Sequence, residues 1–206
     1  MTASVEPGDR RYGRRADAER NRETVIDHAA RLLSEDPAAG MAEIAGRSGV
    51  GRATLYRHFP TRERLIEAIT ARAIDDVETA LASGRLDEGT AGEALQRLTA
   101  GLLEVGDRYR FLLAQETHQA AGEQQRAMEE RLREPVLAVF ERGAQSGEFD
   151  RSLPPVWTIE AFGALCVAAM HAVALGNIDR TDAGTLVTAT LLHGLLGQRA
   201  TQGRAE

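Results

Sequence analysis

Apolar residues recur at intervals of three and four along most of the chain, the spacing that places them on one face of an α-helix. Glycine, proline and acidic residues separate these periodic runs. The predicted helices cover residues 17–35, 41–48, 51–58, 61–81, 93–105, 107–117, 120–146 with a kink near Pro135, 155–175 and 182–197. The pattern therefore predicts an all-α protein.

The second and third of these helices have the pattern of a helix-turn-helix. Their apolar positions are Met41, Ile44 and Ala45 before the break and Leu55 and Phe59 after it. Gly49 lies where the chain must reverse within three or four residues, and a positive φ there is least costly for glycine. In DNA-binding versions the second helix enters the major groove with its first residues at the base edges. Those residues are here Arg52, Ala53 and Thr54.

The run GVGRATLYRHFPTRERLIEAI, at residues 49–69, resembles the TetR family of bacterial transcriptional regulators. The resemblance implies a three-helix DNA-binding head, joined by a long fourth helix to a C-terminal helical domain for ligand binding and dimerisation. The expected domains are an arginine-rich flexible arm (1–16), the head with its linking helix (17–82) and the C-terminal domain (83–206). The arm is either a solvated tail or a segment that touches DNA.

The resemblance also implies which side chains meet double-stranded DNA. The predicted set is Arg52, Ala53, Thr54, Tyr56, Arg57, His58 and Arg62. In it, Arg52 and Ala53 match positions that approach bases, and Tyr56, His58 and Arg62 match positions that contact phosphates. Alternatively, Tyr56 packs between helices and His58 only ends its helix. The sequence departs from the family at Gly40 and Met41, where many members place a serine or threonine that caps the helix.

The last two predicted helices carry many apolar residues, more than one small domain needs to bury. They are Trp157, Phe162, Leu165, Cys166, Ala169, Met170 and Val173 on the first helix, and Leu186, Val187, Leu191, Leu192 and Leu195 on the second. The resemblance implies that these helices pair across a two-fold axis, which makes a homodimer. The alternative is that both are core helices of a monomer.

A small-molecule ligand is expected in the C-terminal domain, where aromatic, methionine and histidine residues cluster. The candidates are Phe111, His118, Met128, Trp157, Phe162, Met170 and His171, with the two histidines as polar anchors. Such residues at helical spacing are also typical of an ordinary core. The acidic C-terminal domain favours a cationic ligand or merely keeps the protein soluble, so the ligand's chemical class stays open.

Charge is divided along the chain in the direction that a DNA-binding head requires. Residues 1–64 hold 12 arginines and 10 acidic residues, whereas residues 65–206 hold 13 and 21. The single cysteine, Cys166, fits a reducing cytoplasm, and the polar N-terminus does not resemble a signal peptide. The apolar run at 161–176 is short for a membrane span and predicts a buried helix.

The sequence contains no Gly-rich phosphate loop, HExxH, CxxC or GxSxG motif, so no catalytic residue, metal or cofactor is predicted. The favoured function is a sequence-specific regulator, a repressor that a small ligand releases from a palindromic operator. Three alternatives stay open. They are an activator of the same fold, a helical interaction protein with a degenerate DNA-binding head, and an enzyme that uses a pocket of the C-terminal domain.

Overall fold

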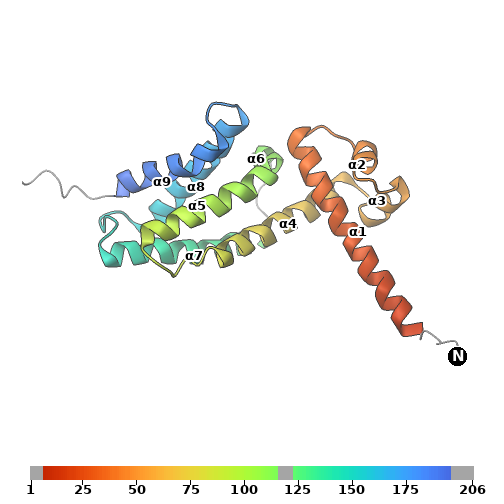
Figure 1. The fold of residues 1–206 in the computed structure, drawn as a ribbon, viewed down its shortest axis with the longest axis horizontal. Coiled ribbons are helices and arrows are strands. Elements are labelled where there is room, and N and C mark those ends of the chain that lie inside the picture. The colour runs from red at the N-terminus through yellow and green to blue at the C-terminus, as the bar shows by residue number, and fades with distance from the viewer. Residues whose placement is uncertain (1–6, 116–122, 196–206) are drawn as a thin grey trace, which may run out of the picture. The chain divides into compact units, whose positions relative to one another are not determined.

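The structure is a computed structural model that describes the backbone of residues 7–115 and 123–195, and the side chains of residues 19–112 and 133–194. Every regular element in these ranges is a helix (Figure 1). The helices are α1 (Pro7–Glu35), α2 (Met41–Arg47), α3 (Arg52–His58), α4 (Arg62–Ser83), α5 (Ala91–Arg108), α6 (Arg110–Gln115), α7 (Glu123–Ser146), α8 (Pro155–Ala174) and α9 (Arg180–Leu195). The all-α prediction is confirmed.

The main difference from the predicted elements lies at the start of the chain. Helix α1 begins at Pro7, whereas residues up to 16 were expected to form a non-helical arm. Proline suits the first position of a helix, and the arginines and alanines after it favour helical backbone even without an apolar stripe. The chain divides into two compact units between Ala73 and Ile74, inside α4, rather than just before Ser83 as expected.

The first unit contains α1, α2, α3 and the beginning of α4. Helix α2 packs against both α1 and α3. The buried apolar side chains are Val25, Ile26, Ala29, Ala30, Leu32, Leu33, Ala39, Ile44, Ala45, Leu55, Phe59, Leu65 and Ile69. Because these residues recur at helical spacing, each helix contributes one stripe to a common core.

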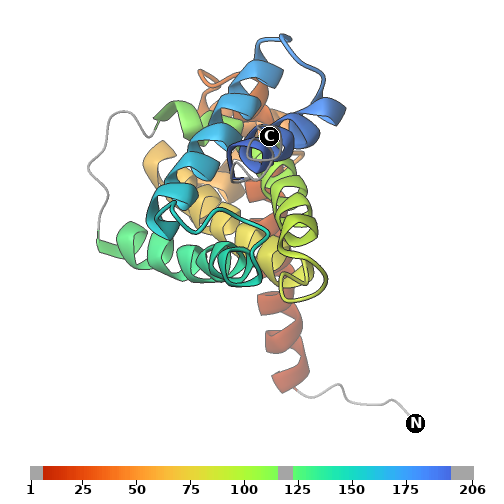
Figure 2. The same ribbon diagram turned by 90° about the vertical axis from the view of Figure 1, so that its left-hand side faces the viewer.

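The second unit is a bundle in which α5 packs against α7, α8 and α9, and α8 packs against α7 and α9 (Figures 1 and 2). Aromatic rings lie at its centre. The ring of Phe140 on α7 has its centroid 6.0 Å from that of Phe149 and 6.0 Å from that of Phe162 on α8. Gly143 is required beside them, since a Cβ there would overlap the Phe149 ring.

The N-terminus of α5 is held by groups near and far in the sequence. Thr90 Oγ1 accepts a hydrogen bond from the Glu93 amide (3.1 Å), and the Thr90 amide donates to Glu93 Oε2 (2.9 Å), which forms a capping box. Glu148, between α7 and α8, accepts from the amides of Ala91 and Gly92, both at 3.1 Å. The carboxylate therefore attaches the α7–α8 connection to the positive end of α5.

Helix α8 is apolar on its outer face as well as its inner face. In its most apolar 18-residue window, only 22% is buried within the chain. Its length and composition alone would allow it to cross a membrane. The prediction of a buried helix therefore holds for only one stripe, which comprises Thr158, Phe162, Cys166 and Ala169.

Candidate functional site

The turn between α2 and α3 has the geometry expected of a helix-turn-helix. Gly49 adopts a φ of +68°, in the left-handed region that glycine tolerates best. Ile44 and Ala45 are buried before the turn, and Leu55 is fully buried after it. Gly40 precedes α2 without any side-chain cap, as the departure from the family pattern predicted. The two helices are thus held together by apolar contacts and by the turn.

Helix α3 has one buried face and one exposed face. Leu55 and Phe59 point into the first unit, as predicted. Arg52, Ala53 and Arg57 are exposed, and Tyr56 is 46% exposed, whereas Thr54 is half-buried. Two guanidinium groups and a phenol hydroxyl therefore lie on the outer surface of one short helix. Such groups can donate hydrogen bonds to phosphates and to the guanine edge in the major groove.

His58 and Arg62 are less available than the resemblance implied. The Nε2 atom of His58 is buried without a hydrogen-bond partner among the described residues, so only Nδ1 could reach a phosphate. The Arg62 guanidinium donates through Nη2 to the carbonyl of Pro37 (2.7 Å) and so ties the start of α4 to the α1–α2 connection. One nitrogen of His58 is therefore out of reach of DNA, and part of the donor capacity of Arg62 serves the fold.

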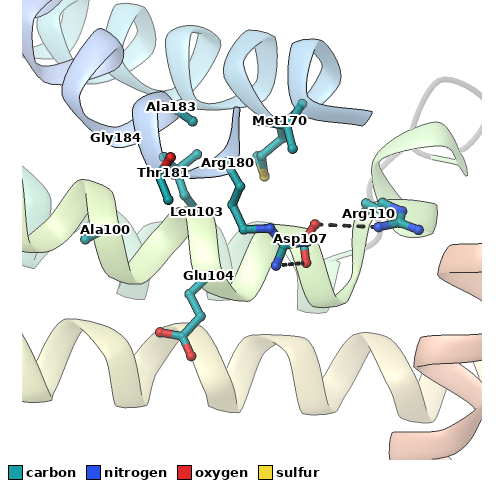
Figure 3. A pocket seen from close by; sticks show the side chains of 11 residues that line it. Ala100, Leu103, Glu104, Asp107, Arg110, Met170, Arg180, Thr181, Ala183 and Gly184 are labelled. Atoms are coloured by element: carbon teal, nitrogen blue, oxygen red, sulfur yellow. Dashed lines mark ion pairs between the residues drawn. The ribbon is translucent and has the colours of Figure 1, made fainter. Parts of the chain in front are cut away.

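The second unit contains a half-open cavity of about 240 Å³ between α5, α8 and α9 (Figure 3). Its walls are mostly apolar and come from Ala100, Leu103, Met170, Val173, Ala183 and Gly184. Gly106 is needed beside it, because a Cβ there would overlap the sulfur of Met170. Charged and polar groups of Glu104, Asp107, Arg110, Arg180 and Thr181 complete the lining. An apolar cavity with a few polar groups is the usual form of a small-molecule site.

Asp107 is the central charged group of this cavity. Its Oδ2 lies 2.7 Å from Nη1 of Arg180, the first residue of α9, and its Oδ1 lies 3.5 Å from Nη1 of Arg110. The Asp107 side chain is 23% exposed, whereas that of Arg180 is 67% exposed. In Figure 3 both dashed contacts meet at this one carboxylate.

The next two residues of the chain connect to α4. Asp76 on α4 accepts hydrogen bonds from Arg108 Nη1 and from the Tyr109 hydroxyl, both at 2.8 Å. Burial, together with the hydrogen bond to Asp76 and its negative charge, raises the pKa of Tyr109 to about 12. The phenol therefore stays protonated and donates to Asp76 at physiological pH.

The residues predicted to bind a ligand do not gather in one place. Met170 lines the cavity, but Phe111 and Phe162 are buried in the core and Trp157 is 63% exposed. His171 is exposed. His118 and the side chain of Met128 lie outside the described residues. The ion pairs of Asp107 were missed because they join residues far apart in the sequence and follow no local pattern.

The predicted dimer helices need a similar correction. Phe162, Cys166 and Ala169 on α8, with Val187 and Leu191 on α9, are buried in the core of their own chain. The exposed large apolar residues of the two helices and the turn between them are Val156, Trp157, Val167, Leu175 and Leu186. Excess apolar surface does exist on these helices. Trp157 and Leu186 of the predicted set contribute to it, together with Val156, Val167 and Leu175, which were not in that set.

Two observations on the described residues concern metal binding and thiol chemistry. No group of three or more His, Cys, Asp or Glu side chains among these residues could hold a metal ion. Burial raises the pKa of the Cys166 thiol to about 12, so the sulfur is not an activated nucleophile.

Comparison with known proteins gives a consistent result. The family described as "Bacterial regulatory proteins, tetR family" matches residues 25–69. The HTH-type transcriptional repressor LfrR of Mycolicibacterium smegmatis is 28% identical over 178 residues, which cover 86% of this chain and 92% of LfrR. The HTH-type transcriptional regulator NfxB of Pseudomonas aeruginosa is 26% identical over 184 residues, which cover 83% of this chain and 96% of NfxB.

A solved structure of LfrR in complex with proflavine superposes on this chain with a TM-score of 0.73. The aligned residues are 26% identical and cover 86% of this chain and 97% of the LfrR chain. The likeness therefore extends over both units and is not confined to the helix-turn-helix.

Proposed function

Because the chain belongs to the TetR family of bacterial regulatory proteins, we propose that it represses transcription as a homodimer bound to a palindromic operator. As a member of this family, it is a DNA-binding regulator of transcription and not an enzyme. We assign DNA binding to residues 17–82, and dimerisation and ligand binding to residues 83–206. A small molecule bound to the second unit releases the operator.

DNA binding is supported mainly by the exposed face of α3, which presents Arg52, Tyr56 and Arg57. Arg52 and Arg57 lie exposed on a helix whose other face is anchored by Leu55 and the adjoining Phe59. In the proposed complex Arg52, at the start of α3, donates two hydrogen bonds to a guanine, and the small Ala53 beside it lets the backbone approach the bases. Tyr56 and Arg57 contact the phosphates and set the register.

The outer face of α8 supports the homodimer. Val156, Val167 and Leu175 are about half exposed or more, and a Cβ at Gly163 would meet nothing within 4 Å in its own chain. A second copy related by a two-fold axis covers this face with the same residues and removes it from water. Two recognition helices related by that axis read the two halves of a palindrome. Pairing of α8 with α8 of the second copy, rather than insertion into a membrane, accounts for its apolar outer face. The protein acts in the cytoplasm.

Ligand-dependent release is supported by the cavity between α5, α8 and α9 and by LfrR, a repressor whose structure holds proflavine. A ligand that binds better to a conformation unsuited to the operator lowers DNA affinity by that difference. Activation of transcription from the same operator would use the same contacts. A reporter gene behind the operator distinguishes repression from activation. A repressor lowers the expression of the reporter, and proflavine restores that expression.

Selection of binding sites from random duplexes with the purified full-length protein tests the proposal. We expect an enriched palindrome, and we expect the double variant R52A/Y56A to lose the enrichment. Recovery of no motif by the wild-type protein would contradict the proposal and favour a helical interaction protein with a degenerate head. An enriched motif without two-fold symmetry would contradict the dimer but not DNA binding.

A further inference from the structure

We propose that the cavity between α5, α8 and α9 binds an organic cation at Asp107. In the absence of this cation, the Arg180 guanidinium forms an ion pair with the Asp107 carboxylate, and the cation displaces the guanidinium. The inference rests on the proposed function, since it names the chemical class of the ligand that releases the operator.

The two partners of the ion pair differ in how easily they can move. Asp107 has a short side chain on the long helix α5 and is 23% exposed. Arg180 has a long side chain that is 67% exposed and begins α9. Because most of the Arg180 side chain is already in water, its guanidinium can leave the ion pair at a smaller cost than the partly buried carboxylate can. The carboxylate cannot leave its place.

The charge that remains after this movement determines which ligand is favoured. When Arg180 leaves, Asp107 keeps the more distant contact with Arg110 (3.5 Å) but loses the close one (2.7 Å). An anion at the vacated position would lie beside the carboxylate and be repelled in a partly dehydrated site. A cation there takes over the close contact of the guanidinium. The geometry therefore selects positive charge at this point.

The walls of the cavity define the rest of the ligand. Leu103, Met170, Val173 and Ala183 offer apolar surface next to the carboxylate. The volume of about 240 Å³ lies just below the about 300 Å³ at which small-molecule sites start, so it limits the ligand to a compact molecule of two or three fused rings at most. The ligand class is thus an amphipathic cation with a flat or compact apolar body. The Arg180 guanidinium competes with this ligand for Asp107. It therefore sets the affinity for Asp107 that a ligand needs in order to displace it.

Equilibrium binding to the full-length protein, without DNA, tests this assignment. The probes are proflavine, which is a planar cation at pH 8, acridine, which has the same three rings without charge at that pH, and 9-anthracenecarboxylate as a planar anion. We expect saturable binding of proflavine with the two other probes at least about tenfold weaker. No saturable binding of proflavine, or equal binding of acridine, would overturn the proposal.

Two variants are expected to act in opposite directions. D107N removes the anchor and weakens proflavine binding by about tenfold. R180A removes the competitor and tightens binding by about threefold to fivefold, the equivalent of one exposed ion pair. Since a misfolded protein would not bind more tightly, the R180A result keeps the test valid even if D107N is damaged. D87N, which removes the same charge from the exposed connection after α4, is the matched control and should bind as the wild type does.

Unchanged binding by D107N, or loss of binding by D87N instead, would place the cation elsewhere and overturn the proposal. Weaker binding by R180A would show that Arg180 assists the ligand rather than competes with it, which also overturns it. Selection of binding sites from random duplexes distinguishes a failure of the proposed cation site from a failure of the proposed function. A protein that binds its palindrome but shows no Asp107-dependent cation binding is still a repressor candidate, whereas a protein that binds proflavine through Asp107 but selects no DNA motif is not.

Discussion

At the scale of single residues, Gly49 shows that a backbone angle can matter more than the space around a residue. A Cβ at Gly49 would meet nothing within 4 Å, yet its φ is +68°. We expect G49A to destabilise the protein by about 1 to 2 kcal/mol through backbone strain alone. G46A, inside α2 and equally free of contacts, should instead stabilise it by about 0.5 to 1 kcal/mol.

Urea unfolding of both variants beside the wild type measures these free energies. The pair controls for the added methyl group, because only the backbone conformation differs. Equal effects of G49A and G46A would contradict the assigned role of the turn.

In the proposed DNA complex, Arg52 is the residue on which sequence discrimination depends most. We expect R52A to weaken binding to the selected operator by about 1 to 3 kcal/mol and to relax the preference at one base pair of each half-site. Fluorescence anisotropy on the operator and on single-base variants measures both effects. R31A removes the same charge from an exposed position of α1 in the same unit and is the control. Similar losses for R31A and R52A on every sequence would mean that Arg52 acts only as a general positive charge.

At the scale of elements, the start of α5 illustrates how a distant carboxylate completes a helix. Burial alone would raise the pKa of Glu148, but the amides of Ala91 and Gly92, the Ser146 hydroxyl and the charge of Arg142 together lower it below the ordinary value of a glutamate. A carboxylate with a lowered pKa in the folded state adds stability above the ordinary pKa, and this stability is lost as the pH falls through the lowered value.

We therefore expect E148Q to cost about 1 kcal/mol at pH 7, as loss of a helix cap does, and progressively less as the pH falls below the ordinary pKa of a glutamate and through the lowered pKa of Glu148. Thermal unfolding of the variant and the wild type at pH 7 and at about pH 3.5 measures the difference. E141Q, at an exposed site on α7, serves as the control for loss of one negative charge. A deficit for E148Q that is the same at both pH values would contradict the role of the ionised carboxylate.

At the scale of the whole molecule, the proposed homodimer depends on the outer face of α8. Val167 lies on this face, 48% exposed in the single chain. We expect V167E to weaken dimerisation by about 100-fold or more, because each copy would bury an unpaired carboxylate. Operator binding should fall with it, although α3 is unchanged.

Sedimentation equilibrium measures the dimerisation constant, and anisotropy measures operator binding at the same protein concentrations. A138E adds the same charge to an exposed position of α7 and should leave the dimer intact. A V167E protein that stays dimeric would show that the interface lies on another surface.

Much of this molecule could be predicted from local patterns. Helical spacing predicted the order of the helices and the core positions Leu55 and Phe59, because periodicity reports which face of a helix avoids water. The glycine of the turn was predicted for the same kind of reason, since the need for a positive φ is local. The resemblance carried by residues 49–69 supplied the family, which the comparisons support.

The sequence by itself therefore determined the order of the helices after residue 16 and the apolar stripes of the first unit, since these depend on neighbours three or four residues apart. The motif at residues 49–69 supplied the resemblance to the family. Only the tertiary structure decided which apolar residues of α8 face inward, that Arg62 binds the Pro37 carbonyl, and that Asp107 meets Arg180. An apolar pattern cannot tell a core face from a face that a second copy covers. Ion pairs between distant helices depend on how the chain packs, and no local spacing encodes them.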